Sequence, residues 1–330
     1  MKGRNFAILG SGVIGLTTGV LLLEKFPKAD VTIYASDFTN LVSHVAGAQF
    51  YPIWLGDGID HSFEKTLKKW FLYSHKRFSE ISNPAHDITK IQNYELARSG
   101  FVPSYFFDVL PNLKITKRAN LPLGYTHMLS FETIMINPLA YLPRLGKKFV
   151  AMGGKLRQKT FVNKRQILNL PQSTVFNCLG CGASIFSDES LMPVKGVILR
   201  LKPTQGLNHV LSFDDHIIAP RKNETYIGAS YIKDNFDLTI TSAEKEYVFN
   251  GIAQALEHAG HPFSLTTGTL KKQNIIGAMS GFRPIRSGGP RVECEQIDDK
   301  KIIHNYGHGG NGVILSWGSS QQAIELADAK

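Results

Sequence analysis

Residues 5–35 read NFAILGSGVIGLTTGVLLLEKFPKADVTIYA, and this stretch decides the expected fold. Residues 5–9 form a short apolar run, and apolar residues then recur at helical spacing as far as Phe26. ADVTIYA is a second run rich in β-forming residues. A strand, a glycine turn, a helix and a strand within about 30 residues predict one βαβ unit, whose parallel strands need the crossover helix.

Gly10, Gly12 and Gly15 form a G-x-G-x-x-G pattern between the first strand and the helix. Such glycines allow a tight turn, a close backbone approach to a pyrophosphate and close helix–strand packing. The helix N-terminus adds unpaired N–H groups and a positive dipole. We therefore expect a dinucleotide site, and the alternative is a purely structural glycine turn.

The acidic residue of this fingerprint should follow the second strand and bind ribose hydroxyls. Here Ala35 and Ser36 follow VTIY, and the first carboxylate is Asp37. Asp37 with Ser36 could reach the ribose from this loop. The alternative is that Asp37 is a solvated loop residue.

Composition narrows the class of protein. The 330 residues are 43% hydrophobic and 19% charged, and no window approaches the roughly 18 uninterrupted apolar residues of a membrane span. No small-residue cleavage pattern follows the apolar N-terminal run, so we expect no signal peptide. These features predict a globular, soluble protein.

The net charge is +10, but the basic residues are scattered along the chain, so nucleic-acid binding is not expected. We expect instead a mild attraction for anionic ligands. Of the three cysteines, Cys178 and Cys181 form a C-x-x-C without a second half-site, so no metal is expected. Unpaired, reduced cysteines favour a cytoplasmic location.

Further elements follow along the chain. Helices are expected at 62–80, 138–151 and 242–259, and a strand at 173–178. VKGVILRLKP, NHVLSFDDHIIAP and ETYIGASYI (residues 194–232) resemble neighbouring antiparallel strands with turns at Pro203, Pro220 and Asn223. Only one βαβ unit is clear, and the densest glycine segment, GHGGNG at 307–312, lies near the C-terminus. This distribution indicates a cofactor held by both ends of the chain in two interwoven domains.

Several segments together resemble the D-amino-acid oxidase family of FAD-dependent oxidases. They are GSGVIGL (10–16), VAGAQFYPIW (45–54), NCLGCGAS (177–184), PVKGVILRL (193–201), GFRPIR (281–286) and HNYGHGGNGV (304–313). The resemblance covers nearly the whole chain in the right order. It implies a mixed α/β protein in which a Rossmann-like FAD-binding domain is interleaved with a substrate domain built on a large mixed, mostly antiparallel sheet. The implied FAD-binding residues are 1–55, 138–192 and 275–330, and the implied substrate-binding residues are 56–137 and 193–274.

The resemblance also implies an activity. It is the oxidative deamination of an amino acid, in which hydride passes from the substrate Cα to N5 of non-covalent FAD and dioxygen reoxidises the flavin. Positioning supplies most of the catalysis in such a reaction, and no catalytic protein residue is expected. Three alternatives stay open: a glycine, N-methyl or tailored amino-acid oxidase, a dehydrogenase with another acceptor, and a flavin-binding protein without turnover. A monomer and a homodimer are both compatible with the sequence.

The resemblance assigns the substrate carboxylate to Arg283, whose planar guanidinium suits a two-pronged contact. A surface or ion-paired arginine is the alternative reading, and Arg286 is the second candidate. His216 occupies the position of a family tyrosine that supports the same carboxylate, although it could equally be an ordinary strand histidine. The further expected substrate contacts are Phe50, Tyr226 and Asn311, with Tyr231 and Ser212 as additional candidates.

The expected cofactor contacts come from both ends of the chain. The histidines His304 and His308 are expected to form structural hydrogen bonds, since hydride transfer needs no base. The full set of expected cofactor contacts is Gly10, Gly12, Val13, Ile14, Ser36, Asp37, Ser43, His44, Ala46, Gly47, Ala48, Gln49, Val162, Cys178, Gly180, Gly281, Arg283, His308, Gly309, Gly310, Asn311, Gly312 and Val313.

Overall fold

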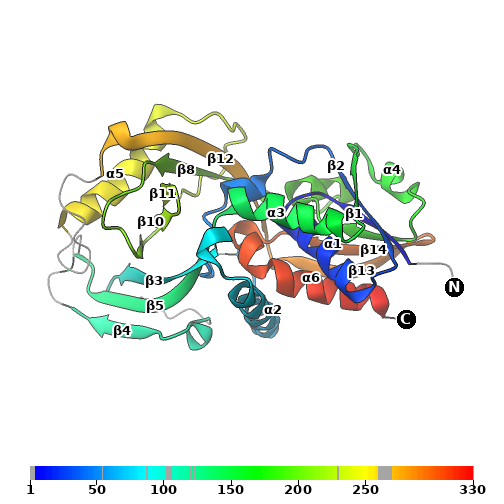
Figure 1. Ribbon diagram of the computed structural model, residues 1–330, viewed down its shortest axis with the longest axis horizontal. Coiled ribbons are helices and arrows are strands. Elements are labelled where there is room, and N and C mark those ends of the chain that lie inside the picture. Colours follow the sequence, from blue (N-terminus) through cyan, green and yellow to red (C-terminus); the bar gives the residue numbers. More distant parts are fainter. Residues whose placement is uncertain are drawn as a thin grey trace.

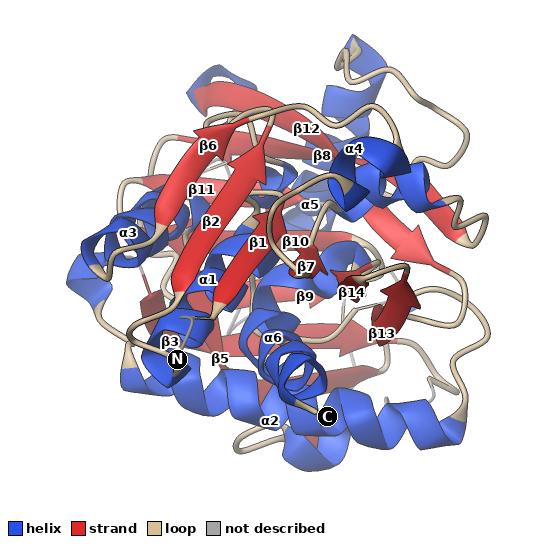
Figure 2. Cartoon of the chain, turned by 90° about the vertical axis from the view of Figure 1, so that its right-hand side faces the viewer, coloured by secondary structure: helices blue, strands red, loops and turns tan. Residues whose placement is uncertain are grey.

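A computed structural model describes residues 4–53, 55–86, 88–101, 106–118, 121, 124–228, 230–258 and 270–329. Its first half is a six-stranded sheet, seen from the end of the molecule in Figure 2. The strands, in the order in which they pair, are β13 (Arg291–Ile297), β14 (Lys300–Tyr306), β7 (Thr174–Asn177), β1 (Asn5–Leu9), β2 (Asp30–Ala35) and β6 (Lys155–Gln158).

Side chains alternate between the two faces of this sheet, as they must in extended strands. In β1, Phe6 and Ile8 enter the core shared with the helices, whereas Ala7 and Leu9 enter a second core on the opposite face. The helices on the first face are α1 (Val13–Lys25), α3 (Pro138–Ala151) and α6 (Gly312–Asp328), and the second face is covered by α4 (Lys164–Leu168). β1, β2, β6, β7 and β14 are parallel, and burial on both faces explains the nearly continuous apolar sequences of the central strands β1 and β2.

The second half is an eight-stranded, mainly antiparallel sheet, which lies to the left in Figure 1. Its strands, in pairing order, are β12 (Ile275–Arg286), β8 (Leu191–Leu201), β11 (Glu224–Gly228), β10 (His216–Arg221), β9 (Val210–Phe213), β3 (Ile88–Ala97), β5 (His127–Ile136) and β4 (Lys114–Lys117).

Opposite faces of the eight-stranded sheet meet different surroundings. Val197, Leu199 and Leu201 of β8 pack in one core with Val248 and Ile252 of α5 (Ser242–His258). Ile198, between them, points to the other face, which borders a cavity. The sheet therefore has one covered face and one face open to a site.

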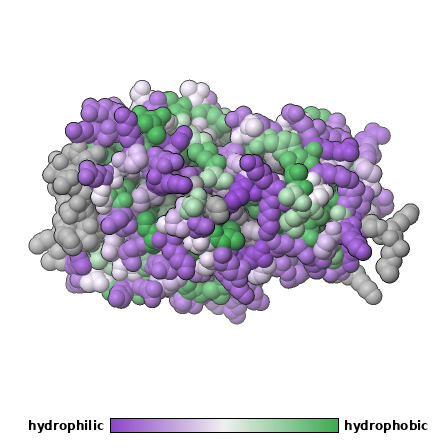
Figure 3. Space-filling view, viewed as in Figure 1, coloured by the Kyte–Doolittle hydropathy of each residue, from purple (hydrophilic) through white to green (hydrophobic). Residues whose placement is uncertain are grey.

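The long helix α2 (His61–Glu80) joins the two halves by packing on α6 (Figure 1). Asp60 caps it by accepting a hydrogen bond from the Phe63 N–H at 2.8 Å. Hydrophobic and hydrophilic side chains are intermixed on the face shown in Figure 3. No helix in the described ranges is both long and apolar enough to cross a membrane.

The expected mixed α/β architecture is confirmed, including the first βαβ unit and the helix after the C-terminal glycines. One turn was wrong: Pro220 lies inside β10, where it pairs with Thr225 of β11. A proline is tolerated there because the pairing of β9 with β10 ends at Ile218, so no neighbour on that side needs the missing N–H.

The domain boundaries stay a prediction. The segment 275–286, expected with the FAD-binding part, forms β12 and pairs along its length with β8 in the eight-stranded sheet.

Two helical glycines predict opposite effects of the same substitution. A Cβ at Gly318 of α6 would collide with the backbone of Trp70, whereas a Cβ at Gly146 of α3 meets only Leu16, at 3.8 Å. We expect Gly318→Ala to lower the free energy of unfolding by about 1–3 kcal/mol through overpacking. Gly146→Ala should raise it by about 0.5–1 kcal/mol through helix propensity. Urea unfolding followed by circular dichroism measures both, and equal effects would contradict this packing of α6 on α2.

Candidate active site

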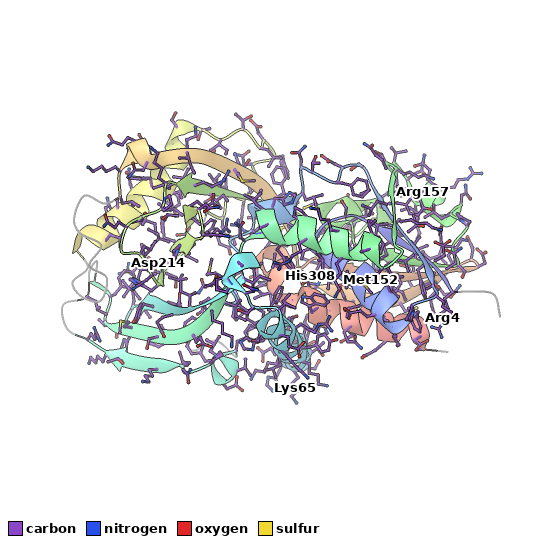
Figure 4. The ribbon with its side chains drawn as sticks, viewed as in Figure 1. Arg4, Lys65, Met152, Arg157, Asp214 and His308 are labelled. Carbon is purple, nitrogen blue, oxygen red and sulfur yellow. The ribbon has the colours of Figure 1, made fainter. Side chains whose placement is uncertain are left out.

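A cavity of about 790 Å³ opens between the two sheets. Its walls come from the β1–α1 turn, residues 45–53, the turn η5 (Gly180–Phe186) after β7, the pocket face of the eight-stranded sheet and the C-terminal glycine segment. His308, labelled in Figure 4, lies between the two halves of the molecule, and Asp214 lies in the half that contains the eight-stranded sheet. One end of the cavity thus belongs to the nucleotide fingerprint and the other to the second sheet.

At the first end, the glycines leave room for a dinucleotide. Gly10 has a φ of +97°, and a Cβ there would lie 2.5 Å from the Cys178 carbonyl oxygen. A Cβ at Gly15 would collide with the carbonyl oxygen of Gly10. Gly10 therefore makes the turn, and Gly15 allows α1 to approach it.

The N-terminus of α1 faces the cavity with partly satisfied N–H groups. Val13 N–H donates to Ser43 Oγ at 3.1 Å, and Ser43 lines the cavity together with Gly12 and Ile14. An uncapped first turn of this kind binds anions. The predicted contacts of Gly10, Gly12, Val13, Ile14 and Ser43 are thus brought together at one end.

Ser36 and Asp37 also line this end, as expected for a ribose site. The Asp37 carboxylate accepts hydrogen bonds from Thr39 N–H and Thr39 Oγ1, both at 2.7 Å, and from Asn40 Nδ2 at 3.1 Å. The Thr39 bonds hold the pKa of Asp37 well below its usual range, so it is an anionic acceptor.

Val162 was expected to contact the cofactor. Its side chain is 71% exposed, its N–H donates to Gln166 Oε1 at 2.9 Å, and it is not part of the cavity wall. Lys159, Thr160 and Phe161 line the cavity there instead.

The segment 46–49 lines the middle of the cavity and is held from behind by a buried arginine. Arg221 Nη2 donates to the carbonyl oxygens of Ala46 and Gly47, both at 3.1 Å, and its Nη1 pairs with Glu224 at 3.2 Å. Gly47 lies against the Tyr226 hydroxyl, which a Cβ would meet at 2.5 Å. Sequence reasoning missed Arg221, because nothing in β10 or β11 alone shows that it would reach residue 46.

The C-terminal glycine segment closes the middle of the cavity. His308, Gly309, Gly310, Gly312 and Val313 all line it, as expected. Burial lowers the pKa of His308 to about 3, so its imidazole is neutral at physiological pH. Within the described chain, His308 Nε2 has no hydrogen-bond partner, which suits a role toward a bound group.

Asn311 was expected to touch the cofactor and the substrate, but its side chain has another task. Its Oδ1 accepts from Ile53 N–H at 2.9 Å and its Nδ2 donates to Ile53 O at 2.8 Å. Asn311 is not part of the cavity wall. It fixes the end of the 45–53 segment against the start of α6.

Arg283 of β12 lies at the end of the cavity that the eight-stranded sheet forms. Its guanidinium sits over Gly196 of β8, where a side chain would collide with it, and Cζ lies 4.3 Å from the ring centroid of Tyr231. Nη1 donates to Ser230 O at 2.6 Å and to Lys195 O at 3.5 Å. Among the described residues no carboxylate pairs with this guanidinium, which therefore remains available to an anionic ligand.

His216 is placed differently from the expected carboxylate-binding group. Its ring stacks on Phe213, with centroids 5.5 Å apart, and Nδ1 pairs with Asp215 at 3.0 Å. On the opposite side the ring fills the space above Gly251 of α5. It borders the cavity while packing against the helix, and Tyr231 is the ring that lies beside Arg283.

Other predicted residues are distributed between the cavity and the core. Phe50 is buried among Phe71, His75 and Phe78, and His44 and Arg286 are likewise not part of the cavity wall. Arg286 pairs with Asp188 at 2.8 Å. Trp54, in the 45–54 motif, lies outside the described residues. The predicted residues that do line the cavity also include Tyr226, Ala46, Ala48, Gln49, Cys178, Gly180 and Gly281.

The two cysteines of NCLGCGAS are protonated thiols in this environment. Burial raises the pKa of Cys178 to about 12 and that of Cys181 to about 11. Thiolates are the form that binds metals or attacks an electrophile. In the described part of the chain, no group of His, Cys, Asp and Glu side chains is placed to hold a metal ion.

Comparison with known proteins identifies the class. The family described as FAD dependent oxidoreductase (DAO) matches residues 5–326, so the chain belongs to this family and FAD is its cofactor. The glycine cradle, the anionic Asp37 and the free Nε2 of His308 fit such a group. The resemblance to the D-amino-acid oxidase family is thereby confirmed.

The sequence relatives cover nearly the whole chain. A D-amino-acid oxidase of Dictyostelium discoideum is 27% identical over 98% of this chain and 91% of its own length. A D-aspartate oxidase of Homo sapiens is 25% identical over 99% of this chain and 95% of its own.

Solved structures share the fold at lower identity. A glycine oxidase from Geobacillus kaustophilus has a TM-score of 0.75 and 14% identity over 98% of this chain and 95% of its own. An L-alpha-glycerophosphate oxidase from Mycoplasma pneumoniae, with FAD bound, has a TM-score of 0.72 and 14% identity over 100% of this chain and 96% of its own.

We expect Gly10→Ala to weaken FAD binding at least about ten-fold, because the added Cβ displaces Cys178 and strains the turn. Gly206→Ala is the matched control: its φ is +80°, but no atom lies within 4 Å of the new Cβ. Titration of the apoprotein with FAD, followed by fluorescence, gives both Kd values. A similarly weakened FAD affinity in the two variants would show that the left-handed strain, and not the close approach of residue 10 to Cys178, lowers the affinity.

Proposed function

We propose that this protein is an FAD-dependent amino-acid oxidase that acts on D-amino acids and uses dioxygen as acceptor. The observation that carries the proposal is the unpaired guanidinium of Arg283 in the same cavity as the glycine cradle. The names of the sequence relatives, D-amino-acid and D-aspartate oxidases, support the substrate class.

Arg283 would hold the substrate carboxylate by its fork-shaped guanidinium. Nη1 is already held by Ser230 O, and the ring of Tyr231 lies 4.3 Å from Cζ, so the guanidinium is fixed before the substrate arrives. A fixed guanidinium sets the position of Cα with little loss of entropy on binding. Tyr226, whose hydroxyl supports Gly47, would keep the cofactor segment in place opposite it.

Bound FAD supplies the acceptor for the hydride that leaves Cα, and the product imino acid hydrolyses to a keto acid and ammonia. The chain's own task is to bind, orient and keep charges apart. His308 stays neutral because of its burial, so it adds no positive charge to the cavity. This fits a mechanism in which no side chain removes the α-proton.

A glycine or N-methyl amino-acid oxidase is the second candidate, supported by the fold shared with glycine oxidases. Use of another electron acceptor is a further alternative, and stopped-flow reoxidation by air-saturated buffer separates it from an oxidase. A flavoprotein without turnover would keep its colour with every amino acid.

The division into an FAD-binding part (1–55, 138–192, 275–330) and a substrate-binding part (56–137, 193–274) belongs to the same proposal. The contribution of β12 to the second sheet supports counting residues 275–286 with the substrate part. A homodimer and a cytoplasmic location remain predictions from sequence.

We expect Arg283→Met to raise the KM for the amino acid at least about thirty-fold while the protein stays yellow, because a charge-assisted bidentate contact is lost. Arg286→Met is the control: it removes a cation three residues along the same strand, outside the cavity. Steady-state oxygen uptake gives KM for both variants. An unchanged KM in Arg283→Met, or a rise in KM confined to Arg286→Met, would contradict the assignment of Arg283 as the residue that binds the substrate carboxylate.

A further inference from the structure

Glu95 of β3 places a buried carboxyl group in the wall of the cavity, well away from the nucleotide end. Its Oε2 is buried and has no hydrogen-bond partner among the described residues. The Tyr51 hydroxyl lies within hydrogen-bonding reach of the carboxyl group. A buried carboxyl group with an unused oxygen is costly unless a partner arrives.

The register of the sheet fixes the position of Glu95 relative to Arg283. Glu95 pairs with Ser212 of β9, Ser212 with Ile217 of β10, and Ile217 with Gly228 of β11. Direct cross-strand partners share a face, and Glu95, Ser212 and Ile217 all line the cavity. The guanidinium of Arg283 lies on the same side, over Gly196 of β8.

β3 and β8 are four strands apart in the sheet. At about 4.8 Å per strand, their backbones are separated by at most roughly 19 Å, measured along the sheet. The two side chains shorten this gap but do not close it. A ligand whose carboxylate is held by Arg283 therefore needs a long side chain to reach Glu95.

The other charges at this end are also acidic. Asp214 and Asp215, in the β9–β10 turn, line the cavity. Asp214 accepts from the Tyr125 hydroxyl at 2.7 Å and pairs with Arg98 at 3.4 Å. Asp215 accepts from the Tyr247 hydroxyl at 2.8 Å and pairs with His216 at 3.0 Å, so both carboxylates already have partners. Among the described lining residues of the eight-stranded sheet, Arg283 is the single lysine or arginine. This acidic wall contrasts with the net charge of +10 of the whole chain.

We propose that Glu95 binds the positively charged end of the substrate side chain, so that the preferred substrate is an amino acid with a terminal amine or guanidinium. This rests on the proposed amino-acid oxidase function. The same carboxyl group would repel a second carboxylate, which sets this chain apart from relatives named D-aspartate oxidase.

The first test compares side chains of similar length and different charge on the holoenzyme. Anaerobic flavin reduction is followed with D-lysine, D-arginine, D-norleucine and D-glutamate, each with its L-enantiomer. We expect the ratio of the limiting reduction rate to Kd for D-lysine and D-arginine to exceed that for D-norleucine at least about ten-fold, with D-glutamate lowest. Reduction by D-norleucine or D-glutamate as fast as by D-lysine would overturn the role of Glu95 but keep the oxidase. No reduction by any of them would instead contradict the proposed function.

The second test removes the charge with little change in shape. We expect Glu95→Gln to lower the D-lysine to D-norleucine ratio of kcat/KM about thirty-fold. Glu132→Gln is the matched control, since it removes the same charge from the adjacent strand β5, outside the cavity. An unchanged ratio in Glu95→Gln would overturn the proposal.

The variant should also fold. Burial raises the pKa of Glu95 to about 7, above its value of 4.5 in the unfolded chain, so ionisation in the folded protein costs stability as pH rises above 4.5. Glutamine has no such cost. Glu95→Gln should therefore be at least as stable as the parent above pH 7, and a variant that loses cation preference without losing Tm is the expected result.

The third test uses pH. The ratio of kcat/KM for D-lysine to that for D-norleucine cancels the titration of the substrate α-amine. With Glu95 ionising near 7, this ratio should rise about ten-fold from pH 6 to pH 8 and stay flat in Glu95→Gln. The groups that the contacts and the strand register place beside Glu95 are Tyr51, whose pKa is raised by burial, and Ser212 and Leu129 of β9 and β5; Asp214, Asp215 and His216 line the same cavity from the β9–β10 turn. A flat ratio in the parent would contradict the proposal.

Discussion

The close approach of the backbone at Gly10 is the constraint on which the rest of the structure depends. Gly10 N–H donates to Tyr34 O at 2.8 Å and Cys178 N–H donates to Leu9 O at 3.0 Å, so three strands meet at this turn. The left-handed turn at Gly10 and the absence of a side chain at Gly15 then bring the N-terminus of α1 to the cavity. A nucleotide-binding site requires this close approach of the backbone, because side chains at Gly10 and Gly15 would cover the N–H groups at the strand ends.

Two clamps, each a pair of side-chain hydrogen bonds to backbone groups, hold the 45–53 segment of the cavity wall. Arg221 holds the carbonyl oxygens of residues 46 and 47, and Asn311 holds both backbone polar groups of Ile53. The first clamp ties the 45–53 segment to the eight-stranded sheet and the second ties it to α6. A single segment is thereby fixed from both halves of the molecule, which is the preorganisation that a positioning mechanism needs.

The charges of the site follow from burial and differ from those of the surface. The imidazole of His308 is neutral, the thiols of Cys178 and Cys181 are protonated, and Arg283 is the free cation at the substrate end of the described cavity wall. The fixed guanidinium of Arg283 and the acidic residues of the wall make the charge uneven along the cavity. The net charge of +10 of the whole chain does not predict this distribution, because a few desolvated groups determine it.

The sequence by itself determined the nucleotide half. Strand, glycines and helix are neighbours along the chain, so their spacing shows the turn directly, and the arginine of GFRPIR and the glycines of GHGGNG were also readable as motifs. The tertiary structure alone decided the second half of the site. No strand was predicted for β3 or β5, and Glu95, Tyr51 and Arg221 gained meaning once strands distant in sequence paired. Likewise, the burial of Phe50 in the core and the turn of Asn311 toward Ile53 depend on α2 and on residues 45–53. A local pattern fixes which turn the backbone makes, whereas the face on which a side chain emerges and the group it meets depend on long-range register.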